Sequence, residues 1–193
     1  MEKFRLIKPT LEYKNQAIEY IKEHYEYKSE INGVGGLNRY LENYEEWLQK
    51  LEDSRNLLAT EEKVPTETFF LIRINDNKII GMINLRLVLN EKLRKFAGHI
   101  GYSIRPTERR KGYGKINLYL SLQECQKYGL KRVMLACDKH NKASAKTIQA
   151  FDAELEREFY DDEMYHCMQQ HYWIDVDKAI NNKKSEYEKY IAN

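Results

Sequence analysis

The sequence predicts a single α/β domain in which helices flank a central mixed β-sheet. Residues 68–89 read TFFLIRINDNKIIGMINLRLVL, two apolar runs joined by NDN, which is typical of an antiparallel β-hairpin. Residues 98–137 contain a strand pattern, a glycine-containing turn, a helix pattern and the run RVMLAC, which together indicate a βαβ unit. A chain of 193 residues without repeats or linkers is long enough for one core. We expect residues 1–176 to form the domain and residues 177–193 a polar helical tail that belongs to it.

The N-terminal third predicts one strand and two helices. Residues 4–7 are a short strand candidate, and apolar residues at roughly helical spacing predict a helix over residues 10–28. The glycine-rich segment NGVGG at residues 32–36 interrupts the pattern. Apolar residues then recur at intervals of three and four over residues 37–51, so we expect a second amphipathic helix there.

The predicted βαβ unit begins with a strand over residues 98–105. A helix follows over residues 112–129, and Gly129 is a suitable residue to end it. RVMLAC supplies the second strand at residues 132–137. A crossover of this kind is right-handed, and its two strands are expected to be roughly parallel. Residues 141–151 then predict a helix, and two strands over about 154–160 and 164–174 predict a closing hairpin.

Composition and charge exclude several classes of protein. Lysine and arginine (32) nearly balance aspartate and glutamate (30), and the net charge of +2 argues against a nucleic-acid binder. The first residues lack the apolar segment of a signal peptide, and no apolar run reaches membrane-spanning length. The three cysteines are widely spaced and odd in number, which favours reduced thiols over disulfides. We therefore expect a cytoplasmic protein without nucleic-acid or membrane partners.

A cluster of positive charge and glycine stands where the predicted strand turns into the helix. The segment RRKGYG supplies Arg109, Arg110 and Lys111, followed by Gly112 and Gly114. The first N–H groups of a helix have no intrahelical partner and carry partial positive charge, so they attract anions. Glycine has no Cβ, and a phosphate can therefore approach the main chain closely. The segment predicts a phosphate-binding loop.

Two familiar phosphate motifs do not fit this loop. A Walker loop would need glycine and serine or threonine at the positions of Arg109 and Ile116. A dinucleotide fingerprint starting at Gly112 would need glycine or alanine at the position of Asn117, and it would follow a first strand rather than antiparallel strands. Neither an ATP site of the Walker type nor a Rossmann site is indicated.

The spacing Q/R-x-x-G-x-G/A does fit, and with it the sequence resembles the GNAT superfamily of acyl-CoA N-acyltransferases. The stretch GHIGYSIRPTERRKGYG resembles an uncharacterised bacterial branch of predicted acetyltransferases. The resemblance implies acetyl-CoA as co-substrate, a sheet splayed between the HIGYSI and RVMLAC strands, and a loop that grips the pyrophosphate. It also implies direct transfer of the acetyl group to an amine, without an acyl-enzyme. The implied cofactor contacts are main-chain groups of Ser103 and Ile104, the loop residues Arg109, Arg110, Lys111, Gly112, Tyr113 and Gly114, and then Asn141 and Ser144.

The sequence departs from the family pattern at two places. Many members have a tyrosine, the general acid for the leaving thiolate, seven residues after the position of Asn141, where this chain has Ile148. Many also have glycine directly after this helix, where this chain reads AFDAE with Asp152. The missing tyrosine leaves open a second reading, a catalytically silent acyl-CoA-binding regulator or sensor of the same fold.

His99 and Asp138 are the candidates for proton transfer. His99 begins the cofactor-facing strand and is a candidate to accept the proton of the amine through water, with a structural histidine as the alternative. Asp138 follows the RVMLAC strand and is a candidate to hold a cationic acceptor, with a turn or cap as the alternative. Cys137 is interpreted as a core residue rather than a nucleophile. Arg86 lies in an apolar strand and is a weaker candidate for an acidic group of the acceptor.

A metal site and a second phosphate loop are both disfavoured. His166, Cys167 and His171 stand in a predicted strand, where His166 and His171 point to opposite faces. NGVGG lies between two helices with no strand before it, so we expect a loop near the acceptor site. A homodimer is expected as one option for this fold. The sequence does not determine the amine acceptor, which is a small molecule or a peptide.

Overall fold

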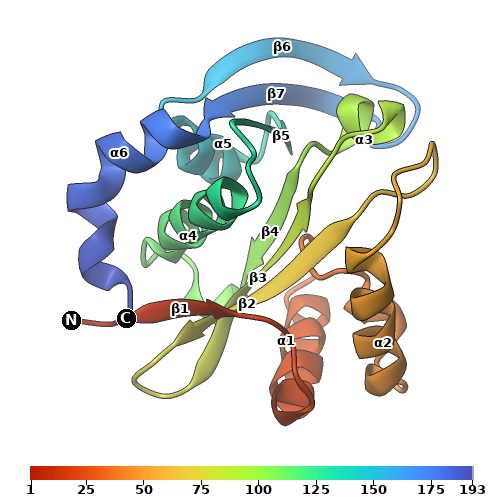
Figure 1. Cartoon of the computed structure of the whole chain (residues 1–193), viewed down its shortest axis with the longest axis vertical. Helices are drawn as coiled ribbons and strands as arrows, with labels where there is room; N and C mark the ends of the chain where they lie inside the picture. The colour runs from red at the N-terminus through yellow and green to blue at the C-terminus, as the bar shows by residue number, and fades with distance from the viewer. Residues whose placement is uncertain (193) are drawn as a thin grey trace.

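The computed structural model describes residues 1–192, and its strands form two antiparallel sheets (Figure 1). The first sheet has the order β1-β2-β3-β4 and the second the order β5-β7-β6. The strand bounds are β1 (Phe4–Ile7), β2 (Thr66–Arg73), β3 (Lys78–Arg86), β4 (Ile100–Ile104), β5 (Arg132–Asp138), β6 (Glu154–Asp161) and β7 (Cys167–Asp175). The predicted hairpin is confirmed as β2 and β3, and Asn77 in its turn has a φ of 49°. The α/β class is confirmed.

The helices cover both faces of the first sheet (Figure 1). Their bounds are α1 (Lys14–Glu26), α2 (Tyr44–Arg55), α3 (Glu91–Phe96), α4 (Tyr113–Lys127), α5 (Lys142–Gln149) and α6 (Val176–Tyr187). Helices α1 and α2 lie side by side on one face, and α4 lies on the other face, between the two sheets. The tail returns to β1, where the Ala192 N–H donates to the Phe4 carbonyl at 2.9 Å. Asn193, the last residue of the predicted tail, lies outside the described residues.

Two helical segments differ from the expectation. The second helix was expected to start at residue 37, but Leu37–Arg39 forms only a short 3-10 turn and α2 begins at Tyr44. The glycines before the 3-10 turn have positive φ, and the acidic residues Glu45 and Glu46 stabilise a helix that begins at Tyr44. Helix α3 was not expected. Its signal was the N-cap Asn90, whose side chain accepts from the Leu93 N–H at 2.9 Å.

The predicted mixed sheet is divided into two. The strands β4 and β5 do not form the parallel ladder that the βαβ pattern suggested, since each belongs to a separate antiparallel sheet. A single bridge, of antiparallel type, joins Gly98 to Leu135 before the strands separate. A Cβ at Gly98 would lie 2.3 Å from the Met134 carbonyl oxygen, so this close approach requires glycine. The sheets therefore meet at Gly98 and open beyond it.

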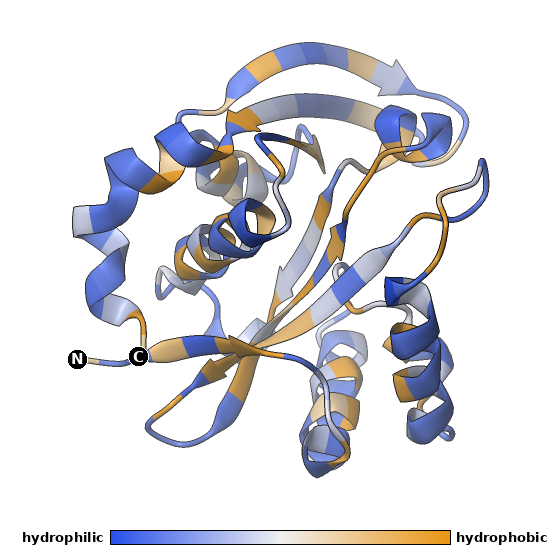
Figure 2. Ribbon diagram, viewed as in Figure 1, coloured by the Kyte–Doolittle hydropathy of each residue, from blue (hydrophilic) through white to orange (hydrophobic). Residues whose placement is uncertain are grey.

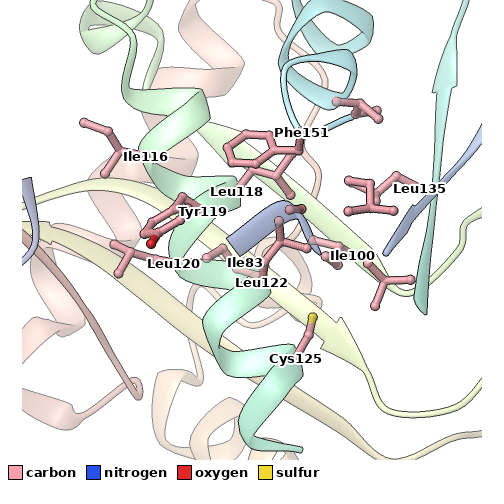
Figure 3. Packing of buried hydrophobic residues seen from close by; sticks show 14 of the residues in the cluster. Ile83, Ile100, Ile116, Leu118, Tyr119, Leu120, Leu122, Cys125, Leu135 and Phe151 are labelled. Carbon is pink, nitrogen blue, oxygen red and sulfur yellow. The ribbon is translucent and has the colours of Figure 1, made fainter. Parts of the chain in front are cut away.

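Hydrophobic residues pack in two clusters, one on each face of the first sheet. The larger cluster fills the space between the two sheets around α4, as Figure 3 shows for Leu118 and Leu122 of this helix with Ile100 and Leu135 of the sheets. The smaller cluster lies under α1 and α2 and includes the fully buried Trp47. Both hydrophobic and hydrophilic residues occur along α1 and α2, as expected for amphipathic helices (Figure 2). Since α4 is packed on several sides, its N-terminus is held firmly relative to β4.

Candidate functional site

The N-terminus of α4 is open to an anion. Gly112 is the N-cap residue with a φ of +85°, and no side chain caps the first turn. A Cβ built on Gly112 would meet nothing within 4 Å, so the space in front of the helix is free. The Lys115 N–H donates to the Gly112 carbonyl at 3.1 Å, whereas the N–H groups of Tyr113 and Gly114 have no acceptor within residues 1–192. These two donors and the partial charge of the helix end suit a phosphate.

Gly114 places this first helical turn against its neighbours. A Cβ at Gly114 would lie 3.5 Å from Thr147 Oγ1 on α5 and 4.0 Å from Ile104 Cγ1 on β4. These are ordinary contact distances, so alanine would fit and larger side chains would push the elements apart. Packing therefore explains why the last position of the motif Q/R-x-x-G-x-G/A, which Gly114 occupies, accepts glycine or alanine. Tyr113, between the two glycines, is buried, and its hydroxyl contacts Glu2 instead of the space before the helix.

The three cations of the loop have different environments. The Arg109 Nε donates to the Ile104 carbonyl at 3.0 Å and its Nη2 to Ser29 Oγ at 2.6 Å, so this side chain braces the end of β4. The Lys111 Nζ lies 2.8 Å from a carboxylate oxygen of Glu108. Arg110 is exposed, has a φ of 64° and takes part in no ion pair within residues 1–192. Arg110 is therefore the loop cation that is free to meet a ligand.

Glu108 is the centre of a cluster of cations behind the loop. Its carboxylate accepts from Arg73, Lys78 and Lys111 at 2.8–3.0 Å. Although its burial raises the pKa, the hydrogen bonds from these three cations outweigh it and lower the pKa of Glu108 to about 2. The cluster ties the loop to the β2–β3 hairpin and neutralises part of the positive charge of RRKGYG.

Every second residue of β4 directs its main-chain N–H and C=O groups toward the opening between the sheets. Arg86 N–H donates to the His99 carbonyl and Arg105 N–H to the Ile80 carbonyl, so odd-numbered residues of this strand bond to β3. Ser103 pairs with Met82, and its hydroxyl donates to the Asn32 carbonyl at 2.6 Å. Of the two main-chain contacts expected from the sequence, only Ile104 therefore presents its groups toward β5. The even-numbered Tyr102 does so as well.

A tyrosine side chain of β4 reaches a serine of α5. The Tyr102 hydroxyl on β4 lies 3.3 Å from Ser144 Oγ on α5. Burial raises the pKa of Tyr102 to about 12, so the phenol is protonated near neutral pH. Ile148 is fully buried in the core and offers no polar atom. The sequence reasoning missed Tyr102, although its alternation with Ser103 in GYSI indicated that the two face opposite sides.

His99 joins the two sheets where they meet. The main-chain N–H of His99 donates to the Met134 carbonyl at 2.7 Å. The imidazole Nδ1 of His99 accepts from the main-chain N–H of Met134 at 2.9 Å. Burial, with the charges of Arg86 and Arg94, lowers the pKa of His99 to about 4. In the neutral imidazole Nδ1 is the acceptor and Nε2 carries the proton. The basic nitrogen is thus already occupied by a structural contact, and the role of His99 as a base stays a prediction.

Asp138 and Asn141 stabilise the turn from β5 into α5. The Asp138 Oδ1 accepts from the His140 N–H at 2.7 Å. The Asn141 Oδ1 accepts from the Ser144 N–H at 3.0 Å and caps α5. Asn141 is exposed, so its amide group is available at the mouth of the opening. The structure brings Asn141 and Ser144 together with Tyr102 and Ile104, while Asp138 has the contacts of a turn residue.

The segment NGVGG lies against the opposite side of β4. A Cβ at Gly33 would be 2.4 Å from the Gly101 carbonyl oxygen, which requires glycine at this position. The Ser103 hydroxyl holds the same segment through Asn32 and also contacts the Tyr20 hydroxyl at 2.9 Å. The loop is therefore packed onto the strand rather than loose. It borders the side of β4 that faces away from α4.

Other chemistry has little support in the described part of the chain. Residues 1–192 contain no group of three histidine, cysteine, aspartate or glutamate side chains able to hold a metal ion. Burial raises the pKa of the Cys137 thiol to about 11, which disfavours the thiolate that a nucleophile needs. All three cysteines are free. None of the helices over residues 1–192 combines the length and apolar character needed to cross a membrane.

Comparison with protein families matches residues 36–153 to the acetyltransferase (GNAT) family. This match spans more than half of the 193 residues, and the chain belongs to that family. No protein of curated function matches this sequence.

Solved structures with the same fold include several acetyltransferases. Ribosomal-protein-S5-alanine acetyltransferase from Vibrio fischeri is 18% identical, with a TM-score of 0.64 and coverage of 92% of this chain and 95% of that chain. The microcin C7 self immunity acetyltransferase MccE, in complex with acetyl-CoA and AMP, is 20% identical, with a TM-score of 0.63 and coverage of 90% and 92%. RimJ from Mycobacterium smegmatis, in complex with CoA-disulfide, is 12% identical, with a TM-score of 0.69 and coverage of 94% and 88%. At these identities the likeness establishes the fold.

Proposed function

We propose that this protein transfers an acetyl group from acetyl-CoA to a primary amine. The observation that carries the proposal is the open, uncapped N-terminus of α4, where Gly112 leaves free space in front of unpaired N–H groups. Membership of the GNAT family and an acetyl-CoA complex of a structure with the same fold support the choice of ligand. The first turn of α4 and Arg110 then hold the pyrophosphate, and Ile104 with Asn141 holds the pantetheine arm.

The reaction follows from a direct attack. The amine nitrogen forms a bond to the acetyl carbon, the carbon–sulfur bond breaks, and the proton lost by the nitrogen is balanced by a proton gained by the sulfur. In this proposal the Tyr102 hydroxyl donates to the leaving sulfur, since it is the phenol that reaches into the opening between β4 and α5. His99 and Asp138 are kept as proposed partners for the amine.

The proposal also covers the class of the acceptor, the cellular compartment and the oligomeric state. Structures with this fold include a ribosomal-protein-S5-alanine acetyltransferase and a spermidine N-acetyltransferase chimera. Alanine and spermidine both carry an amine, and we propose an amine for this chain too. The three free thiols favour a reducing compartment such as the cytoplasm. The homodimer remains a prediction.

A catalytically silent acyl-CoA-binding regulator is the second candidate. The observation that favours it is Ile148, a buried aliphatic side chain where many family members have the acid. Both candidates require binding of acetyl-CoA at α4, but only the enzyme releases free CoA thiol when an amine is added. The two proposals therefore differ in turnover and not in affinity.

One pair of measurements tests both candidates. Calorimetric titration with acetyl-CoA measures binding, and thiol release in the presence of a panel of primary amines measures transfer. Binding with thiol release supports the enzyme, whereas binding without release to any amine supports the silent module. Absence of binding would reject both and would place the function of the α4 N-terminus elsewhere.

A further inference from the structure

A guanidinium group lies over β4 on the side away from α4. Arg86 ends β3, and its Nη1 donates to the Gly98 carbonyl at 3.1 Å. The two terminal nitrogens lie 3.5 Å from the position of a Cβ on Gly101. Because Gly101 has no side chain, the guanidinium stands directly against the strand. Gly33 N lies 3.4 Å from the same position, so the NGVGG segment borders the group on its other side.

Arg86 has no acidic partner within residues 1–192. Three other arginines that are largely or partly buried each have one: Arg73 pairs with Glu108, Arg94 with Glu156 and Arg105 with Glu23. A guanidinium has five N–H donors, and in the described residues Arg86 uses one of its nitrogens in a hydrogen bond. Burial lowers the pKa of Arg86, because the charged guanidinium loses part of its hydration. A partly buried and unpaired cation destabilises the fold unless a ligand compensates it.

The turn between β6 and β7 is held by one carboxylate. The Asp161 carboxylate accepts from the N–H groups of Glu163, Met164 and Tyr165 at 3.0–3.2 Å, which fixes the turn. Burial raises the pKa of Tyr165, and the Arg86 charge acts in the opposite direction.

We propose that Arg86 binds an anionic group of the acceptor, so that the acceptor is an amine that also carries a carboxylate or a phosphate. The planar fork of a guanidinium matches both groups through two parallel hydrogen bonds. The side of β4 at Gly101 lies opposite α4, so the anionic group and the CoA pyrophosphate bind at separate places. This inference rests on the proposed function and specifies its substrate class.

The test compares matched amines. The anionic probes are L-alanine, γ-aminobutyrate and O-phosphoethanolamine, and their neutral partners are L-alaninamide, 4-aminobutyramide and ethanolamine. We expect at least one anionic amine to exceed its neutral partner in kcat/KM by about tenfold to a hundredfold, the range for a hydrogen-bonded ion pair. In Arg86→Gln this ratio should fall to about one through a higher KM, while the Kd of acetyl-CoA stays unchanged. Carboxylate and phosphate probes distinguish the two anions.

Two further variants control for charge and folding. Arg86→Lys keeps the charge without the fork, and we expect an intermediate preference. Arg132→Gln removes an exposed arginine of β5 and should leave the preference intact. Neutral amines accepted as well as the anionic ones, or a preference that persists in Arg86→Gln, would overturn the inference.

Binding separates this inference from the proposed function. If no amine is acetylated, the same six probes are titrated onto the CoA-saturated protein. Anionic probes that bind the native protein and fail to bind Arg86→Gln would support the anion site although the proposed transfer had failed. Equal binding of all probes to both proteins would reject the anion site itself.

Discussion

The Tyr102 hydroxyl lies 3.3 Å from Ser144 Oγ, and this contact crosses from β4 to α5 over the opening between the two sheets. The phenol therefore occupies the region where the family resemblance places the thioester arm. In our proposal this phenol of β4 takes the role of the tyrosine that many family members have on the helix corresponding to α5.

We expect Tyr102→Phe to reduce kcat by about tenfold, the effect of one hydrogen bond made to the leaving sulfur in the transition state. The Kd of acetyl-CoA should change little, because the aromatic ring remains. Steady-state thiol release and calorimetry measure the two quantities. Tyr160→Phe is a matched control, since its exposed hydroxyl contacts only the His166 carbonyl on the β6–β7 hairpin. Native turnover in Tyr102→Phe would remove this phenol from the mechanism.

Arg110→Gln should weaken CoA by about fivefold and leave a pantetheine fragment without phosphates unaffected, because the lost attraction is to the pyrophosphate. Lys111→Gln should weaken CoA less, since Glu108 already neutralises this cation. A joint change of Arg109 and Arg110 should have the largest effect, because Arg109 also braces the Ile104 carbonyl. Calorimetric titration of each variant measures the Kd.

Lys127→Gln, at the other end of α4, serves as the control for a general loss of charge. Equal losses for CoA and for the pantetheine fragment in Arg110→Gln would place the pyrophosphate away from this loop.

We expect Gly112→Val to abolish stabilisation by acetyl-CoA. A ligand at a hundred times its Kd stabilises the folded state by about 2.7 kcal/mol, which raises the Tm of a chain of this size by roughly 5–10 °C. Valine would project into the free space before α4 and would resist the φ of +85°. Melting curves with and without acetyl-CoA measure the shift. A folded Gly112→Val variant with the full native shift would mean that the phosphates bind elsewhere.

The stability of the protein should fall on acidification because of His99. Its pKa is about 4 when folded and near 6.5 when unfolded, so between these values the unfolded chain binds the extra proton. The free energy of unfolding therefore decreases as the pH falls from 6.5 to 4, by up to about 3 kcal/mol for this imidazole. His171, with a pKa also of about 4, contributes in the same direction. Urea unfolding of the native protein at pH 7 and pH 5 measures the effect.

His99→Gln should reduce this pH dependence, and the remaining part is assigned to His171. The same variant tests the proposed catalytic role, because the loss of a general base should lower turnover with little change in the Kd of acetyl-CoA. Unchanged turnover across pH together with a smaller stability slope would leave His99 with its contact to Met134 alone.

The glycine-containing turn that starts α4 was predictable from sequence because its determinants are local. The pattern RRKGYG between a strand and a helix defines a helix N-terminus, and the structure confirms Gly112 at positive φ in the N-cap. The β2–β3 hairpin was equally predictable, since alternating apolar residues and a turn rich in asparagine act over a few residues. The family resemblance implied that β4 and β5 splay apart, but not that they belong to two separate antiparallel sheets, which depends on the contact of Gly98 with Met134.

The sequence by itself indicated the family, through the resemblance of its glycine-containing motif. It also determined the position of the helix that starts at this motif and the order of most elements, since these follow from periodicity and turn residues within short windows. Only the tertiary structure decided which cation of the loop is free. Arg109 and Lys111 find partners at Ser29 and Glu108, and a carboxylate or hydroxyl can neutralise or hold a charge only when the fold brings them together. The same reason applies to Arg86, which has no acidic partner among residues 1–192, because this is a property of the packed chain and not of any sequence pattern.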